Sequence, residues 1–275
     1  MGHRLIYGPL DLKDVDAVIV RSATTITKEH LKSLSPGTLK LIIRAGVGLD
    51  NIDTNAARQA GIQVRNTPDA PVNAVAELAI GHIVSCARSI SIQGHQLRTG
   101  KWEKKNGTEL WGKRLGILGY GRIGKRIAQL AKGFGMIVSA SDPAVEPHPP
   151  EFLPRDQLLR QSDILVLAMP AMKTPVLDRD VISQLKDGVI VINISRGCNV
   201  DEFALLEGLR SGKIRAAGLD VWENEPNILP ELRNHPAVSC TPHIGASTVE
   251  AQERIGREIV RIIRDFSCAS DNSVV

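Results

Sequence analysis

The chain has 275 residues, 43% of them hydrophobic and 23% charged, which excludes intrinsic disorder and allows two compact domains or one large α/β domain. Its 34 basic and 30 acidic residues are scattered and leave a net charge of +4, so we expect no nucleic-acid-binding surface. No run approaches the roughly 18 to 20 apolar residues that span a bilayer, and no signal-peptide pattern begins the chain, so we expect no membrane partner.

Short β-branched runs alternate with segments of helical period in the first third of the chain. This pattern is typical of βαβ units that form a parallel sheet. We expect strands at residues 17–20, 39–45 and 62–64, and helices between them at residues 28–34 and 54–60.

A long apolar segment follows Pro71 and runs from residue 72 to about residue 89. It predicts a buried helix, because a helix without a polar face cannot remain in water. From Gly94 to Gly112 the helical period is lost and polar residues dominate, so we expect a loop that leads into a second domain.

Beyond residue 112 the alternation of strands and helices becomes regular and predicts one doubly wound parallel sheet. The expected strands are 115–118, 136–140, 164–168, 189–194, 216–221 and 238–241, and the expected helices are 123–132 and 202–211. Five prolines between Pro143 and Pro154 predict a loop. A capping-box pattern from Ser247 to Glu250 predicts a last helix that ends near Asp265.

A glycine motif, Gly119-Tyr120-Gly121-Arg122-Ile123-Gly124, lies between an expected strand and an expected helix. In a dinucleotide site, Gly119 would allow the tight turn, Gly121 the approach of the pyrophosphate, and Gly124 close packing of the helix. The N–H groups at Arg122 and Ile123 would meet the phosphates. Asp142, 18 residues after the motif, would bind the ribose hydroxyls and repel a 2′-phosphate, so the motif predicts NAD as the cofactor.

Two candidate reacting groups directly follow expected strands, where an open α/β sheet places its ligands. Arg196 has a forked guanidinium, which suits the carboxylate and carbonyl oxygen of a 2-oxo acid. His243 is of the residue type that gives or takes a proton near neutral pH, as hydride transfer at a carbonyl requires. A carboxylate beside it would fix its tautomer and favour the imidazolium, and the spacing leaves both Glu223 and Glu225 open for this role.

The first domain contains a second glycine turn, Gly46-Val47-Gly48, after an expected strand. Its backbone N–H groups could hold a substrate carboxylate. Arg21, which follows strand 17–20, is the candidate for a second anionic group. On residue type alone, both features are equally compatible with a purely structural role.

The four cysteines, at positions 86, 198, 240 and 268, are widely spaced and form no C-x-x-C pair. This spacing predicts no metal site and is typical of a reducing compartment. We therefore expect a cytoplasmic protein without a metal.

With these residues in place, the sequence resembles the D-isomer-specific 2-hydroxyacid dehydrogenases, and within them the D-3-phosphoglycerate dehydrogenases. The resemblance rests on several motifs in family order: residues 20–24, 44–53, 66–68, 119–124, 195–197, 220–226 and 241–248. It implies that Arg196, Glu225 and His243 are the catalytic residues, which favours Glu225 over Glu223. Met169, before Pro170, departs from the Thr that relatives often carry.

The resemblance also implies two further groups of site residues. Besides the glycine motif and Asp142, the cofactor contacts would be Pro170, Ser195, Asp220 and Gly245. The substrate contacts would be Arg21, Ser22, Gly46, Val47 and Gly48, with Arg21 near a phosphate.

The fold implied by the resemblance is α/β, with two doubly wound parallel-sheet domains. Residues 81–245 would form a Rossmann-type NAD domain. Residues 1–80 and 246–275 would form a smaller, flavodoxin-like substrate domain, N-terminally shortened by about 25 to 30 residues, the size of one strand-helix unit. A homodimer through the NAD domain is implied as well.

The function implied is NAD-dependent oxidation of 3-phosphoglycerate to 3-phosphohydroxypyruvate, a step of serine biosynthesis. One alternative is the same chemistry on another small 2-hydroxy or 2-oxo acid, such as glyoxylate or hydroxypyruvate. An alternative of another class is an NAD-sensing interaction protein of corepressor type, which the Arg, Glu and His set does not exclude.

Overall fold

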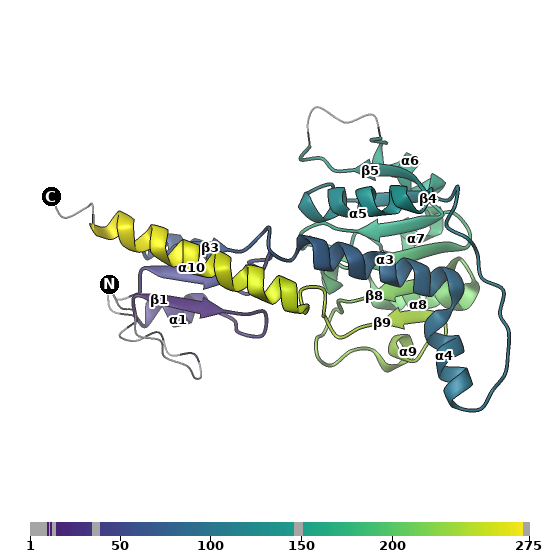
Figure 1. Ribbon diagram of the computed structural model, residues 1–275, viewed down its shortest axis with the longest axis horizontal. Coiled ribbons are helices and arrows are strands. Elements are labelled where there is room, and N and C mark those ends of the chain that lie inside the picture. Colours follow the sequence, from purple (N-terminus) through teal and green to yellow (C-terminus); the bar gives the residue numbers. More distant parts are fainter. Residues whose placement is uncertain (1–9, 11, 13–14, 35–38, 146–150, 272–275) are drawn as a thin grey trace. The chain divides into compact units, whose positions relative to one another are not determined.

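The computed structural model describes residues 10, 12, 15–34, 39–145 and 151–271 (Figure 1). The chain forms two compact units, one of residues 1–71 with 249–275 and one of residues 72–248. The divisions were expected at 80/81 and 245/246. The first of these positions falls inside a helix that belongs wholly to the larger unit.

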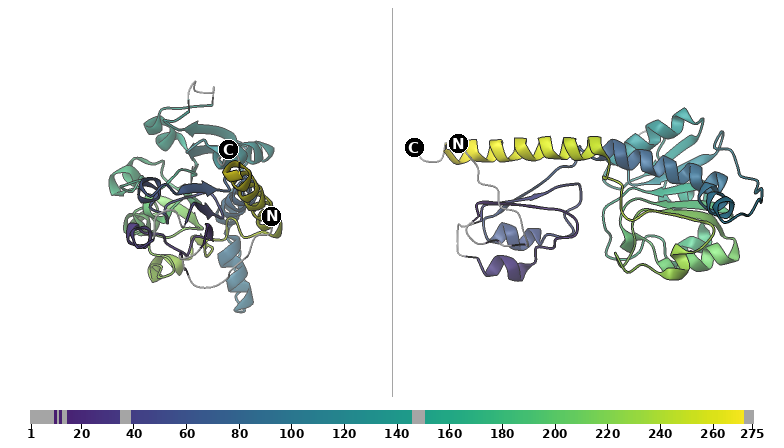
Figure 2. Two further views of the ribbon diagram at one scale, coloured as in Figure 1. Left: turned by 90° about the vertical axis from the view of Figure 1, so that its left-hand side faces the viewer. Right: turned by 60° about the horizontal axis from the view of Figure 1, so that its bottom comes forward.

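The smaller unit contains a parallel sheet of three strands in the order β1-β2-β3. The strands are β1 (Ala17–Val20), β2 (Leu41–Arg44) and β3 (Gln63–Asn66), and the helices are α1 (Lys28–Lys32), α2 (Thr54–Gln59) and α10 (Val249–Asp271). Successive strands move across the sheet in one direction, so right-handed crossovers place α1 and α2 on the same face (Figure 2). Buried side chains such as Ile26, Leu31, Ile42 and Ala57 fill the space beneath them.

The larger unit is built on a parallel sheet of six strands in the order β5-β4-β6-β7-β8-β9. The strands are β4 (Arg114–Leu118), β5 (Ile137–Ser141), β6 (Ile164–Leu167), β7 (Val189–Asn193), β8 (Ile214–Leu219) and β9 (Val238–Cys240). The strand order reverses between β4 and β6, and ligands of open α/β sheets bind outside the carboxyl ends of the strands at such a point. The sheet therefore confirms the predicted α/β fold.

Helices cover both faces of this sheet (Figure 1). The helices of this unit are α3 (Val72–Arg88), α4 (Ile90–Arg98), α5 (Arg122–Gly133), α6 (Arg155–Gln161), α7 (Arg179–Gln184), α8 (Glu202–Ser211) and α9 (Pro230–Arg233), with a 3-10 turn at Gly197–Asn199; α4 buries none of its residues. Along β6, Ile164 and Val166 pack in one core with α3 and α5, while Leu165 and Leu167 pack in the other with α6, α7 and α8. This alternation explains why β6 is hydrophobic throughout.

The prediction of a polar loop from Gly94 to Gly112 is wrong for its first residues, because α4 continues to Arg98. Its N-cap residue, Ser89, is left-handed (φ 53°) and makes no side-chain cap, and no residue of α4 is buried. The helix therefore has neither the start signal nor the apolar stripe on which the prediction depended.

Other boundaries differ by smaller amounts. The last helix begins at Val249 rather than Ser247, because the Ser247 N–H donates to Ile244 O in a turn, and it continues to Asp271 rather than Asp265. The short helices α6, α7 and α9 were not expected. Of the proline-rich stretch 143–154, residues 146–150 lie outside the described part.

Among the described residues, no single helix is both long and apolar enough to cross a bilayer. The pair α3 and α4, bent by 66° at their junction, meets that requirement only when the two are taken together.

Candidate active site

The glycine loop after β4 has a different steric environment at each of its three glycines. Gly119 has a φ of +92°, and a Cβ there would lie 2.6 Å from the Ala168 carbonyl oxygen. A Cβ at Gly124 would overlap the carbonyl oxygen of Gly119. A Cβ at Gly121 would meet nothing within 4 Å, so this position is open in front of the helix. These are the three environments that a tight turn, close helix packing and an approaching pyrophosphate require.

The loop leads into α5, which begins at Arg122 and Ile123 without a side-chain cap from Gly121. The N–H groups of a first helical turn point out of the helix, and the positive end of the helix dipole lies there. The open position at Gly121 and this helix end fit a dinucleotide phosphate.

Asp142 lies directly after β5 and holds the glycine loop. Its Oδ2 accepts a hydrogen bond from the Tyr120 N–H at 2.7 Å, and its Oδ1 accepts one from the Ala144 N–H at 2.9 Å. The carboxylate is therefore fixed between the loop and the end of β5. Its contact with the ribose hydroxyls stays a prediction.

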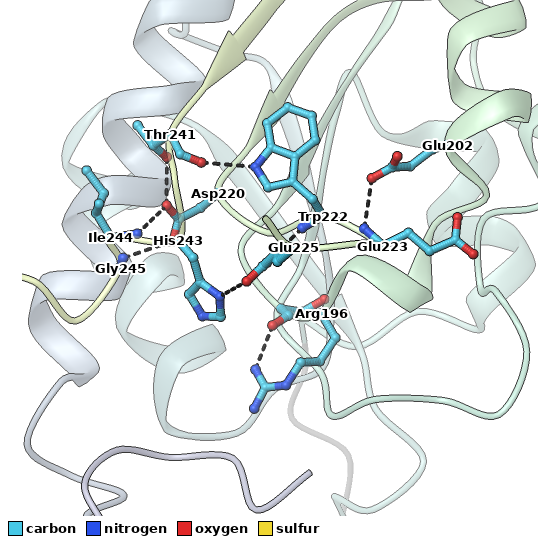
Figure 3. Close-up of polar contacts among 11 residues, drawn as sticks. Arg196, Glu202, Asp220, Trp222, Glu223, Glu225, Thr241, His243, Ile244 and Gly245 are labelled. Atoms are coloured by element: carbon cyan, nitrogen blue, oxygen red, sulfur yellow. Dashed lines mark hydrogen bonds and ion pairs between the residues drawn. The ribbon is translucent and has the colours of Figure 1, made fainter. Parts of the chain in front are cut away.

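His243 and Glu225 come together from segments that follow β9 and β8 (Figure 3). His243 Nδ1 lies 2.7 Å from Glu225 Oε2, and each side chain is 35% exposed. The other oxygen, Oε1, accepts from the Trp222 N–H at 3.0 Å. In contrast, the Glu223 side chain points away from His243, and its N–H donates to Glu202 Oε1 (Figure 3). The structure thus brings to His243 the carboxylate that the family resemblance indicated.

Arg196 follows β7, and its side chain lies near those of Glu225 and His243 (Figure 3). Its Nη1 donates to the Ser195 carbonyl oxygen at 2.7 Å. Burial of Glu225 opposes ionisation, but the hydrogen bonds from His243 and the Trp222 N–H and the charge of Arg196 outweigh it and hold the pKa of Glu225 below its usual value. The site therefore holds an ionised carboxylate behind an imidazole, with a guanidinium beside them.

Asp220 anchors the loop that carries His243. Its Oδ1 accepts from the Thr241 hydroxyl at 2.6 Å and the Ile244 N–H at 2.8 Å, and its Oδ2 accepts from the Gly245 N–H at 2.8 Å. Asp220 is 2% exposed, and His243 itself has a left-handed φ of 54°. The three hydrogen bonds bracket His243 and hold this unfavourable backbone in place. The family resemblance implied that Asp220 and Gly245 contact the cofactor, and the anchoring role of Asp220 was not expected.

Two buried asparagines organise the neighbouring cofactor candidates, Ser195 and Pro170. The Ser195 hydroxyl donates to Asn193 Oδ1 at 2.7 Å and accepts from Asn199 Nδ2 at 3.0 Å. Asn199 Nδ2 also donates to the Pro170 carbonyl oxygen at 3.0 Å. Neither asparagine was predicted from the sequence. Asn193 ends β7 and Asn199 ends the 3-10 turn, and Ser195 lies between them.

The substrate candidates belong to the smaller unit. Gly46 has a φ of +141°, and the Arg44 guanidinium occupies the place that a Cβ would take. The turn is held by the Asn66 side-chain N–H, which donates to Val47 O at 2.5 Å, and by the Thr67 N–H, which donates to Gly46 O at 3.0 Å. Gly48 completes the turn. Arg44, the last residue of β2, was not among the predicted site residues.

Arg21 and Ser22 are exposed residues that follow β1. Arg21 Nη2 donates to Gln252 Oε1 of α10 at 3.3 Å. Since β1 and β2 are parallel and Val20 pairs with Arg44, both Arg21 and Arg44 lie at the carboxyl end of this sheet. No group of three His, Cys, Asp or Glu side chains in the described part of the chain is placed to hold a metal ion.

The chain is similar to known proteins over most of its length. The NAD binding domain model of the D-isomer specific 2-hydroxyacid dehydrogenases matches residues 80–245. A hydroxypyruvate reductase from Thermotoga maritima is 46% identical over 262 residues, which cover 92% of this chain and 85% of that protein. A D-3-phosphoglycerate dehydrogenase from Mycobacterium tuberculosis is 40% identical over 262 residues, 91% of this chain, and this chain spans only 49% of its length.

The crystal structure of a D-lactate dehydrogenase from Aquifex aeolicus, complexed with NAD and lactic acid, superposes with a TM-score of 0.85 at 29% identity. The match covers 96% of this chain and 86% of that chain. The cofactor is therefore NAD, and the chain belongs to the D-isomer-specific 2-hydroxyacid dehydrogenases, a family of NAD-dependent oxidoreductases.

Proposed function

We propose that this dehydrogenase oxidises 3-phosphoglycerate to 3-phosphohydroxypyruvate in serine biosynthesis, with Arg196, Glu225 and His243 as its catalytic residues. The observation that carries the catalytic assignment is the 2.7 Å contact between His243 Nδ1 and Glu225 Oε2. Because Nδ1 is engaged by the carboxylate, Nε2 is the ring nitrogen that takes the proton of the substrate hydroxyl. Bound NAD⁺ would supply the acceptor for the hydride that leaves C2.

Each protein group has one task in this proposal. Arg196 holds the substrate carboxylate and the oxygen at C2 with its forked guanidinium. Glu225 stabilises the imidazolium that forms when His243 takes the proton. The low pKa of Glu225 supports this role, because the carboxylate stays charged at neutral pH.

The phosphorylated substrate is supported by two cations at the carboxyl end of the sheet in the smaller unit. Arg21 and Arg44 lie at the same end of neighbouring strands, and the Arg44 guanidinium lies over Gly46. A three-carbon acid with a carboxylate and a phosphate has two anionic ends, and we assign Arg21 and Ser22 to the phosphate and the turn from Gly46 to Gly48 to the carboxylate.

A second candidate is reduction of hydroxypyruvate, which the likeness to the Thermotoga reductase supports. The two candidates differ in the phosphate, so kinetics with phosphorylated and unphosphorylated substrates separate them. The experiment follows NADH absorbance with D-3-phosphoglycerate and D-glycerate in one direction, and with 3-phosphohydroxypyruvate, hydroxypyruvate and glyoxylate in the other.

Arg21→Gln tests the phosphate contact, and Arg65→Gln in β3 of the same unit is the matched control. We expect Arg21→Gln to lower kcat/KM for the phosphorylated pair by about 10- to 100-fold, the worth of one hydrogen bond to a charged group. Unphosphorylated substrates should be unaffected. A wild-type preference for hydroxypyruvate, with equal effects of Arg21→Gln on both pairs, would replace the first proposal by the second.

We also propose that the enzyme is a cytoplasmic homodimer that associates through the larger unit. Large apolar side chains are exposed on α4 and on the segment that follows it: Ile90 at 53%, Leu97 at 58%, Trp102 at 80% and Trp111 at 79%. These exposures support an interface in this region, because aromatic and large apolar side chains are enriched at protein interfaces. Light scattering of the wild type and of Leu97→Lys tests the association, and the variant should be monomeric.

A further inference from the structure

A buried histidine outside the catalytic set contacts the strand that leads to His243. His82, on α3, is 3% exposed. Its Nδ1 lies 3.0 Å from the hydroxyl of Ser239, in β9, and its Nε2 lies 3.1 Å from the hydroxyl of Thr241. The imidazole thus bridges two positions of the segment that ends in the catalytic loop.

The donor and the acceptor of each hydrogen bond in this network can be assigned. The Thr241 hydroxyl donates its only hydrogen to Asp220 Oδ1, so toward His82 it can only accept. His82 Nε2 must therefore carry the hydrogen. Burial lowers the pKa of His82 and outweighs the opposing charge of Asp220, so the ring is neutral and Nδ1 accepts from Ser239.

The fold lets α3 approach β8 closely at His82. A Cβ at Gly218, in β8, would come within 2.7 Å of the His82 Cβ, so the glycine allows this close packing. On the side away from the catalytic loop, the Ser91 hydroxyl donates to Ser239 at 3.4 Å. Ser91 and Ser239 line a cavity of about 220 Å³, so the network runs from that cavity to Asp220.

We propose that His82 is a positioning residue for the acid/base histidine. Its Nε2–H occupies the acceptor site of the Thr241 hydroxyl and so directs the hydrogen of Thr241 to Asp220. Asp220 in turn holds the residues on both sides of His243 through Thr241, Ile244 and Gly245. Because His243 has a left-handed backbone, loss of one of the three hydrogen bonds lets its imidazole move from Glu225. The inference rests on the proposed role of His243.

The experiment compares His82→Leu, which removes both ring nitrogens, with His82→Gln, which keeps a side-chain N–H donor. His95→Leu, the same change at an exposed histidine of α4, is the control. We expect His82→Leu to lower kcat by about 10- to 100-fold, as a small misplacement of a catalytic group does, with a much smaller change in KM. His82→Gln should recover most of the loss, and His95→Leu should behave as the wild type.

A pair of substitutions at Thr241 separates positioning from packing and keeps the test valid if His82→Leu does not fold. Thr241→Val is isosteric and removes the hydroxyl, whereas Thr241→Ser keeps it. We expect Thr241→Val to lower kcat as His82→Leu does and Thr241→Ser to retain it. In the Thr241→Val background, His82→Leu should cause no further loss of kcat, because its effect is transmitted through that hydroxyl.

Unchanged kcat in Thr241→Val, or a full additional loss in the double variant, would overturn the inference. His243→Gln is measured in parallel. If His243→Gln loses turnover while the His82 and Thr241 variants keep it, only the positioning role fails. If His243→Gln itself retains wild-type turnover, the proposed catalytic assignment fails.

Discussion

The backbone N–H of Tyr120 donates a hydrogen bond to Asp142 over 2.7 Å, so a carboxylate from the end of β5 is tied to the middle of the glycine loop. The negative charge of this side chain is thereby held at the loop that the phosphates of NAD approach. The contact links cofactor choice to the shape of the loop.

Asp142→Asn keeps an oxygen that can accept from Tyr120 but removes the charge. We expect kcat/KM with NADP to rise by about tenfold or more, because a charged carboxylate repels a 2′-phosphate, and kcat/KM with NAD to fall. Parallel kinetics with the two cofactors measure the ratio. An unchanged preference for NAD would mean that Asp142 only shapes the loop.

Gly121 and Gly133 lie at opposite ends of α5, and a Cβ at either position would meet no protein atom within 4 Å. Gly121→Ala and Gly133→Ala are therefore matched substitutions, and both variants should fold. We expect only Gly121→Ala to weaken NADH binding, by about tenfold or more, because its methyl group occupies the approach of the pyrophosphate. Fluorescence titration with NADH checks this, and equal affinities in the two variants would contradict the placement of the phosphates.

Glu225→Gln removes the charge behind His243 and retains an oxygen that can accept its hydrogen. Because the pKa of Glu225 lies below its usual value, the wild-type residue is charged at neutral pH and the substitution removes that charge. We expect kcat to fall by about 10²-fold, within the range of general acid/base assistance. Glu223→Gln, two residues away with its side chain turned from His243, should keep kcat. If both variants were equally active, the contact between Glu225 and His243 would not contribute to catalysis.

The unfolding free energy should fall as the pH is lowered below neutrality. Burial lowers the pKa of both His82 and His235 in the folded protein, so each binds a proton less readily there than in the unfolded chain. The stabilising contribution is therefore present above the unfolded histidine pKa of about 6.5 and is lost as the pH falls below it. Urea titrations at pH 7.5 and pH 5.5 measure the change. A His82→Gln, His235→Gln double variant should show a smaller loss, and a loss equal to that of the wild type would refute this assignment.

Features determined by neighbours in sequence were predictable. The glycine motif could be recognised because a turn, a close approach and a helix contact each depend on one glycine within six residues. The strand-end positions of Arg196 and His243 followed from the alternation of strands and helices. In contrast, α4 was missed because it lacks both a cap and a buried stripe.

Features determined by contacts between distant residues were not predictable from one chain. Asp220 lies 24 positions before Ile244, and His82 lies 159 positions before Thr241. No local pattern distinguishes a histidine that bridges two serine or threonine hydroxyls from one that only fills the core. The choice between Glu223 and Glu225 also depends on contacts with distant residues. Glu225 contacts His243, which lies 18 positions later, whereas the N–H of Glu223 donates to Glu202.

The division of the chain between its two units has an evolutionary consequence. The side chains proposed to move the proton all come from residues 72–248, and those proposed to recognise the rest of the substrate come from residues 17–66. Mutations that alter which acid is accepted can therefore accumulate in one compact unit while selection preserves the acid/base machinery in the other. A lineage built in this way can acquire new substrates without rebuilding its chemistry.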